Sequence, residues 1–308
     1  MKKVSLKDFI GELRASLKGQ YTNALWPIGG FFIIFIALSL ICLYFFQGIA
    51  SSIMMSLMMV MYGMASMGAI GFAFLEMLVA LGLLLAVRFF YGFFQVAFQY
   101  TYLARYRDDS QKVSASSIWQ QYKRLNKNQL WRLALYAGLF IFLWTLPLDI
   151  VGGLLAKYKV AVIICRVLNL IVVIWKALQY SQGYFVYKDK RPEFLGQSMR
   201  HALTASKRFM KGLKWNYLLV MIVTVVLPIV IWTAIFGGLG YYGIYTATNF
   251  CIWLGFILAF LGLVAWLPVC YAATALYYHK TAPAQDLDKD FEGTFKSVEV
   301  LTGQADKK

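Results

Sequence analysis

The chain of 308 residues is 60% hydrophobic and 14% charged, with a mean hydropathy of +0.63 and a formal net charge of +16. Soluble domains contain about a quarter charged residues, so this composition excludes a soluble fold and makes lipid the solvent. The placement of the positive charge must then decide whether it serves a nucleic acid, a substrate or a membrane.

Six segments are long and apolar enough to cross a bilayer, which takes about 20 residues. In chain order they are 24–46, 73–103, 130–154, 160–187, 215–239 and 250–277. We therefore predict an all-α polytopic membrane protein with six transmembrane helices. We expect an N-terminal amphipathic interfacial helix over 1–22, the transmembrane domain over 23–280, and a polar, disordered cytoplasmic tail over 281–308.

The stretch "SSIMMSLMMVMYGMASMGAIG" separates the first two spans and repeats methionine every three residues from Met55 to Met67. Thioethers bind copper(I), but no His or Cys stands beside these, and methionine is also a flexible filler of apolar surfaces. We expect no metal site. The segment predicts an outer re-entrant or interfacial hairpin packed on the bundle rather than a seventh span.

Lysine and arginine placement favours six spans with both termini cytoplasmic. In that topology 25 basic residues fall on one side, and only Lys157 and Lys159 fall on the other. Such a bias marks the cytoplasmic side. A seventh span would put the first basic cluster opposite the others.

A border motif occurs three times, as "RASLKGQYTNALW", "KRLNKNQLW" and "RFMKGLKW". Each ends in a tryptophan that opens an odd-numbered span, namely Trp26, Trp131 and Trp215. Gly or Asn ends a helix, and tryptophan favours the headgroup level. We interpret the chain as three tandem hairpins, each preceded by a basic interfacial helix. Chance convergence of border residues is the alternative.

The stretch 200–215 carries unbalanced positive charge beside the fifth span. On a helix its basic residues lie near one face, while Met199, Ala202, Phe209, Met210 and Leu213 line another. A basic amphipathic helix next to a span is typical of the membrane interface, where cations bind anionic headgroups. We therefore expect lipid rather than nucleic acid as the partner. The residues assigned to headgroups are Arg200, Lys207, Arg208, Lys211 and Lys214.

Asp149 and Arg166 lie within spans, where charges are unfavourable. Asp149 lies eight residues before Lys157 of the outer turn, and Arg166 lies nine residues after it. In an antiparallel pair of helices this spacing predicts that both residues lie at the same depth in the membrane. We expect a structural ion pair between the third and fourth spans. A gate or proton path is the alternative.

Arg88 and Lys176 are cations without a carboxylate at their depth. Both lie about 15 positions from the outer end of spans that run inward. Facing one bundle interior, they would suit an anionic ligand such as a lipid phosphate. The alternative is that both side chains extend toward the cytoplasmic headgroups.

Residues 168–215 resemble the bacterial membrane family Domain of Unknown Function 975. The resemblance rests on "KALQYSQGYFVYKD" from Lys176 and "SMRHALTASKRFMKGLKW" from Ser198, with Val172 and Val173 standing where the family often has Pro-Gly. It covers the C-terminal half well and the N-terminal half only in layout. It implies a multi-pass protein of the bacterial cytoplasmic membrane and no particular activity.

Catalytic constellations find little support in the sequence. His201 and His279 stand at membrane borders without paired carboxylates, and no phosphate loop follows a strand. We expect a non-enzymatic envelope accessory or scaffold that binds anionic lipid or partner proteins, without a cofactor. The alternative is a transporter or lipid-handling permease with an anion-accepting cavity near Arg88 and Lys176.

Overall fold

The computed structural model describes residues 4–64, 67–194 and 196–295. This part of the chain is all helical, without a strand, and six of its helical segments are long and apolar enough to cross a membrane. The predicted fold class is therefore confirmed. The α-helices are α1 (Leu6–Leu17), α2 (Tyr21–Met61), α3 (Met67–Arg107), α4 (Ala115–Arg124), α5 (Lys127–Leu154), α6 (Lys159–Tyr180), α7 (Gly183–Lys190), α8 (Arg200–Phe209), α9 (Lys214–Met221), α10 (Leu227–Tyr245), α11 (Asn249–Thr281) and α12 (Leu287–Phe291).

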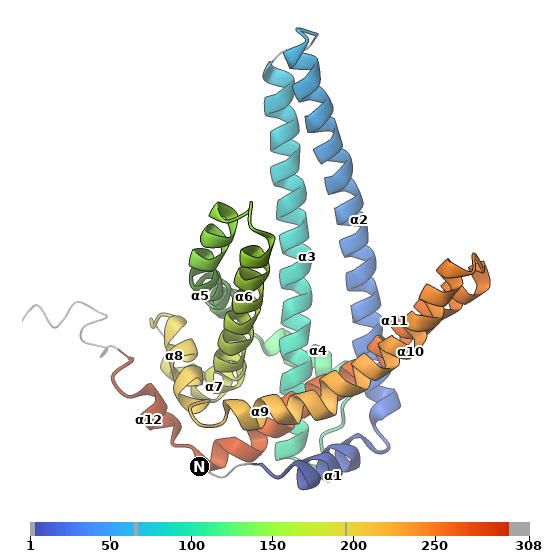
Figure 1. The fold of residues 1–308 in the computed structure, drawn as a ribbon. Coiled ribbons are helices and arrows are strands. Elements are labelled where there is room, and N and C mark those ends of the chain that lie inside the picture. Colours follow the sequence, from blue (N-terminus) through green and yellow to red (C-terminus); the bar gives the residue numbers. More distant parts are fainter. Residues whose placement is uncertain (1–3, 65–66, 195, 296–308) are drawn as a thin grey trace, which may run out of the picture.

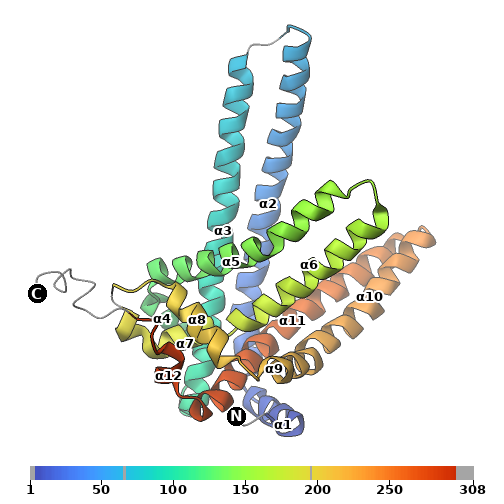
Figure 2. The ribbon, with the colours of Figure 1, turned by 60° about the vertical axis from the view of Figure 1, so that its left-hand side comes forward.

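The long helices form three tandem hairpins, α2–α3, α5–α6 and α10–α11, as Figures 1 and 2 show. The short helices α1, α4 and α8 precede them in turn. The fifth span starts as α9 and passes through one π-helical turn, Ile222–Val226, before continuing as α10. The predicted layout of three hairpins, each with a short basic helix before it, is the observed one.

The repeated border motif has a structural basis. Gly19 lies just after the end of α1 and has a φ of +77°, and Gly212 lies just after the end of α8 and has a φ of +81°. Only glycine adopts this left-handed conformation without strain, so each marks a helix end. In the middle repeat Asn126 instead caps α5, and its side chain accepts a hydrogen bond from the backbone N–H of Gln129 at 3.3 Å.

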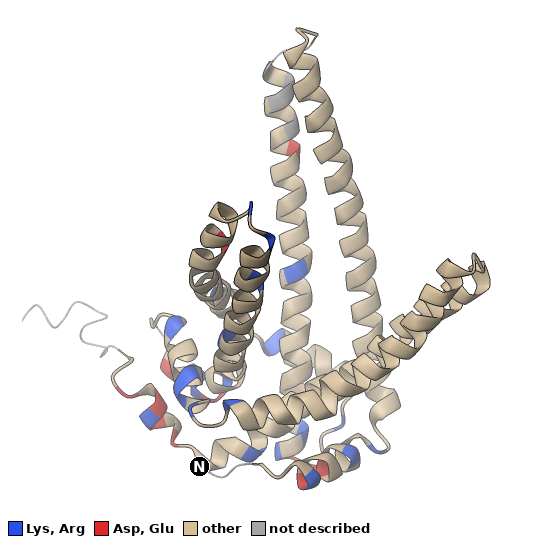
Figure 3. Cartoon of the chain, in the orientation of Figure 1, with Lys and Arg blue, Asp and Glu red and all other residues tan. Residues whose placement is uncertain are grey.

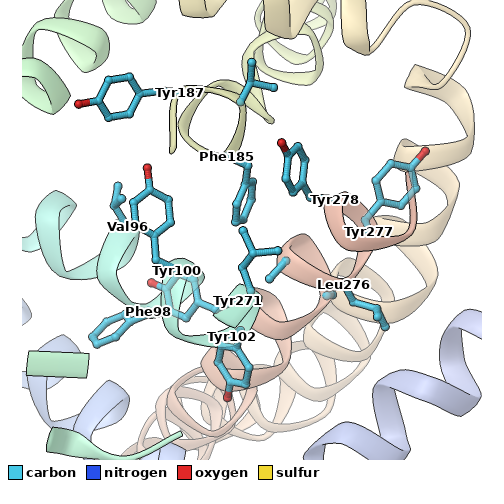
Figure 4. Close-up of a cluster of buried hydrophobic side chains, with 14 of the residues drawn as sticks. Val96, Phe98, Tyr100, Tyr102, Phe185, Tyr187, Tyr271, Leu276, Tyr277 and Tyr278 are labelled. Carbon is cyan, nitrogen blue, oxygen red and sulfur yellow. The ribbon is translucent and has the colours of Figure 1, made fainter. Parts of the chain in front are cut away.

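The three hairpins diverge from a common base formed by α1, α4, α7, α8, α12 and the near ends of the long helices (Figures 1 and 2). The hydrophobic core lies in this base. Tyr100 from α3, Phe185 from α7 and Tyr278 from α11 meet there (Figure 4). The ring centroid of Phe185 lies 6.2 Å from that of Tyr100 and 5.0 Å from that of Tyr278. Phe9 of α1 and Phe209 of α8 are fully buried in the same core.

The hairpins themselves are covered by exposed apolar side chains, such as Leu83 on α3, Ile171 on α6 and Ile231 on α10. In their most apolar 18-residue windows, between 6% and 17% of residues are buried within the protein. Lipid or other helices must therefore cover these surfaces. Lys and Arg gather on the base, while the hairpins are almost free of charge (Figure 3).

The first hairpin corrects the expectation for residues 48–72. α2 continues without interruption to Met61, so the described part of the methionine-rich stretch is the far end of a long hairpin and not a separate re-entrant element. At about 1.5 Å per residue its 41 residues extend about 60 Å, twice a typical hydrocarbon core. Met58 and Met61 are exposed there.

The tail corrects a second expectation. We expected 281–308 to be disordered, but residues up to 295 follow a defined path on α8, with residues 296–308 lying outside the described part. Phe291 is 4% exposed and packs against Phe194 with ring centroids 5.6 Å apart. Phe295 stacks on Phe291 at 4.9 Å. Two aromatic anchors thus order a segment whose polar composition predicted disorder.

Asp290 should make docking of this tail dependent on pH. Burial, opposed by the Arg208 charge, raises the pKa of Asp290 from 3.8 to about 6. Its Oδ2 atom is buried without a hydrogen-bond partner. Because the docked state binds the proton more tightly than the free tail, docking is strongest below pH 3.8 and weakens as the pH rises to about 6.

Asp290→Asn should therefore protect the amides of α12 from hydrogen exchange more strongly than wild type at pH 7.5. It should also remove the change in protection between pH 4 and pH 6. Glu292→Gln, a change at an exposed neighbouring position, is the control and should keep the wild-type profile. An unchanged profile in Asp290→Asn would show that another group titrates.

Candidate functional site

A cluster of lysines lies where α6, α8 and α9 meet. Lys176 of α6 is 8% exposed, and its Nζ lies 3.7 Å from the ring centroid of Trp144 on α5. A tryptophan face attracts a cation at this distance. Trp144 thus holds in place an ammonium group that is otherwise unfavourable in an apolar region.

Lys214, the first residue of α9, is held in a similar way. Its Nζ lies 4.2 Å from the ring centroid of Trp175. In the amide orientation that satisfies its neighbours, Gln179 accepts hydrogen bonds from Lys214 Nζ at 3.1 Å and from Trp175 Nε1 at 2.8 Å. Trp215 packs edge-on against Trp175 at 6.2 Å.

Lys207 of α8 completes the cluster, which we call the lysine junction: Lys176, Lys207 and Lys214. The charges of Lys207 and Lys214 both act on Lys176, and that of Lys207 acts on Lys214. None of the three makes a salt bridge within the described ranges. Three cations of like charge, two of them against tryptophan rings, thus lie together without a carboxylate to pair them in the described chain.

The junction groups the predicted residues differently from expectation. Lys176 joins two residues of the basic stretch and not Arg88, which is exposed on α3 and whose NH1 lies 3.5 Å from Gln95 Oε1. Arg88 and Lys176 thus contact different residues and do not form one site in the structure. Their hairpins, α2–α3 and α5–α6, separate above the base (Figure 1).

The basic stretch also departs in part from expectation. Its apolar face, which includes Ala202, Phe209 and Leu213, is buried against protein in the base and is not free for the membrane. Arg208 NH1 donates to the backbone carbonyls of Asp290 and Glu292 at 3.0 Å and 2.7 Å. Arg200 and Lys211 are exposed. The helix is therefore a component of the base that presents cations outward.

Asp149 contacts a different partner from the one predicted. Its Oδ1 accepts a hydrogen bond from Asn169 Nδ2 at 2.6 Å, and no salt bridge joins Asp149 to Arg166 in the described chain. The turn between α5 and α6 spans 155–158, and Gly152 packs against Cys165 across it. This register places Asn169, one helical turn beyond Arg166, opposite Asp149.

Trp144, Trp175 and Gln179 hold the lysine junction, but no charge pattern or motif in the sequence assigns them this role. Their only signal is proximity to Lys176 along α6 and across the hairpin. The described residues contain no group of three or more His, Cys, Asp or Glu that could hold a metal ion.

Comparison of the chain with protein-family models, with curated proteins and with solved structures finds no match. The resemblance to Domain of Unknown Function 975 therefore stays a prediction from the motifs between residues 168 and 215. What the composition and structure establish is a six-span, all-α, multi-pass membrane protein.

Proposed function

We propose that this chain is a non-enzymatic scaffold of the bacterial cytoplasmic membrane, an envelope accessory that binds anionic lipid and partner membrane proteins. The observation that carries the proposal is the divergence of three apolar hairpins from one packed base (Figures 1 and 2). Each hairpin presents most of its apolar surface outward. Such surfaces are available to lipids and to the helices of other proteins.

The same geometry argues against a transporter, the alternative function. A transport pathway requires spans that surround it, with the substrate site between them. Here α2–α3 leans away from α10–α11. Arg88 and Lys176, the cations proposed to line an anion cavity, make separate contacts.

Anionic phospholipid is the ligand that best suits the lysine junction. A basic residue at the membrane surface contributes on the order of 1 kcal/mol to binding of anionic lipid. The tryptophans beside the junction are typical of the headgroup level. A phosphodiester headgroup would neutralise the repulsion among Lys176, Lys207 and Lys214 without leaving the interface.

Lipid retention tests this assignment. We expect wild-type protein, purified in mild detergent and examined by native mass spectrometry, to retain phosphatidylglycerol in preference to phosphatidylcholine. Lys176→Gln with Lys214→Gln should weaken lipid binding by about 2 kcal/mol, or roughly 30-fold, since each lysine contributes about 1 kcal/mol. Lys159→Gln, at the opposite end of α6, is the matched control and should retain lipid as wild type does. An equal loss of bound lipid in the double variant and in Lys159→Gln would show that the lysine junction does not bind lipid.

Cysteine labelling tests the proposed orientation, with the basic base cytoplasmic. In a background without Cys42, Cys165, Cys251 and Cys270, a cysteine at Ser52 or Asn249 should react with an impermeant thiol reagent added outside cells. One at Ser110 or Ser198 should react only after permeabilisation. Ser52 and Asn249 are exposed toward the far ends of two hairpins, whereas Ser110 and Ser198 belong to the base. Outside labelling at Ser198 would overturn the topology.

A further inference from the structure

A cavity of about 350 Å³ opens in the base between α3, the α4–α5 junction and α7. It shares no residue with the lysine junction. Its lining is mixed, with tyrosines, amides and basic side chains beside two leucines. The lining residues are Tyr100, Gln121, Arg124, Leu125, Asn126, Leu130, Tyr187, Lys188 and Arg191.

The charge of this lining is entirely positive. Arg124, Lys188 and Arg191 contribute three cations, and no carboxylate lines the cavity. None of the three makes a salt bridge within the part of the chain that the structure describes. The adjacent acidic residue Asp189 is already bound by both guanidinium nitrogens of Arg107, at 2.9 Å and 2.7 Å. The cavity therefore has an excess of positive charge that its neighbours do not neutralise.

Hydrogen bonds hold these cations in place before any ligand arrives. Arg191 NH1 donates to the backbone carbonyl of Arg124 at 2.9 Å, which ties η1 (Arg191–Phe194) to the end of α4. Lys188 Nζ lies 3.5 Å from the Tyr100 carbonyl and 4.5 Å from the centroid of the Tyr100 ring. Tyr100, which Figure 4 shows in the buried cluster, is itself fixed by a hydrogen bond from its hydroxyl to the Tyr184 carbonyl at 2.6 Å.

The start of α5 adds to the positive potential. Asn126, the N-cap of this 28-residue helix, lines the cavity. The first backbone N–H groups of a helix lack intrahelical partners and carry the positive end of its dipole. The amide groups of Gln121 and Asn126 provide further donors. The cavity is therefore lined mainly by hydrogen-bond donors, namely two guanidinium groups, one ammonium group and two side-chain amides.

We propose that this cavity binds a phosphate group, carried either by an anionic lipid headgroup or by free phosphate. Guanidinium groups pair with two oxygens of a phosphate at once, and lysine supplies a point charge. The site is distinct from the lysine junction, so it does not depend on lipid binding there. It adds a second anion site, built on the connections between the hairpins.

The test uses full-length protein and two probes that separate the sources of phosphate. Delipidated protein in maltoside detergent is titrated with inorganic phosphate and followed by calorimetry. The same protein in nanodiscs of phosphatidylglycerol or phosphatidylcholine is examined for retained lipid by native mass spectrometry. The variants are Arg124→Gln and Lys188→Gln. Lys112→Gln, which removes an exposed cation from the connection between α3 and α4 outside the cavity lining, is the matched control.

Two results support the site. Phosphate binding that weakens about tenfold in Arg124→Gln and Lys188→Gln, but not in Lys112→Gln, assigns it to free phosphate. Phosphatidylglycerol retention that weakens in the same variants, without phosphate binding, assigns it to a lipid headgroup. Wild-type behaviour of Arg124→Gln in both arms would overturn the proposal.

Two further measurements keep the result unambiguous. Arg124 is exposed, so its replacement leaves the core intact, and circular dichroism and gel filtration will show that the variant is folded. The lining of this cavity shares no residue with the lysine junction, which Lys176→Gln combined with Lys214→Gln tests separately. Failure of the lipid assignment at the lysine junction and failure of this cavity are therefore distinguishable.

Discussion

Replacing Gly255 with alanine should lower the free energy of unfolding by about 3 kcal/mol, the upper end of the range for inserting a group into a packed interface. Gly255 of α11 lies directly against the backbone of α10. A Cβ atom at this position would meet the amide nitrogen of Gly240, and it would lie 2.6 Å from the Phe236 carbonyl oxygen and 2.7 Å from Gly240 Cα. These are backbone atoms, so no side chain can rotate away, and the two helices must separate.

Close packing matters more here than in a soluble protein. Lipid chains are as apolar as the helix surfaces, so close van der Waals contact, rather than the hydrophobic effect, holds membrane helices together. Alanine has a higher helix propensity than glycine by about 1 kcal/mol, which is too little to offset the clash. We expect earlier loss of the tryptophan fluorescence signal when sodium dodecyl sulfate is added to protein in mild detergent.

Gly238→Ala provides the matched control for this measurement. Gly238 also lies on α10, but a Cβ atom there has nothing within 4 Å. Its replacement should leave stability unchanged or raise it by up to about 1 kcal/mol through helix propensity. Similar unfolding of Gly238→Ala and Gly255→Ala would show that the α10–α11 contact does not have this geometry.

The sequence predicted the parts of the fold that depend on local physics. Spans follow from apolar length, and the helix borders follow from glycine conformation at Gly19 and Gly212. The layout of three hairpins was predictable because a basic cluster and a tryptophan recur at the start of each hairpin. What could not be predicted was the relation between hairpins, since an apolar helix surface packs on lipid as well as on protein.

The site required long-range information in the same way. Lys176 and Lys214 were both identifiable as cations at a membrane border. Their common site depends on how α6, α8 and α9 meet in the base. The Asp149 contact depended on the helical register across the α5–α6 turn, where an error of one turn exchanges Arg166 for Asn169. The tail is ordered by the buried side chain of Phe291. The polar composition of the tail as a whole does not reveal the effect of this one aromatic residue.

Asp189→Asn should have the second large effect, because Asp189 joins three elements of the base. Its two carboxylate oxygens accept hydrogen bonds from Arg107 of α3 at 2.9 Å and 2.7 Å. Oδ2 also accepts from the Tyr278 hydroxyl of α11 at 2.7 Å. The Asp189 side chain is 17% exposed and that of Arg107 is 44% exposed. We expect a loss of about 2 kcal/mol, since charge-assisted hydrogen bonds are lost but water still reaches the arginine.

The ion pair between Arg105 and Asp109, which flank Arg107 in the chain, is a stringent control. Its atoms are 3.5 Å apart and the Asp109 side chain is 100% exposed. An exposed pair contributes little because water screens it, so Asp109→Asn should leave unfolding in mixed detergent unchanged. Adding Arg107→Gln to Asp189→Asn should recover part of the lost stability, because the unpaired guanidinium is then removed. Strictly additive losses in that cycle, or equal effects of Asp109→Asn and Asp189→Asn, would show that the α3–α7–α11 contact does not stabilise the base.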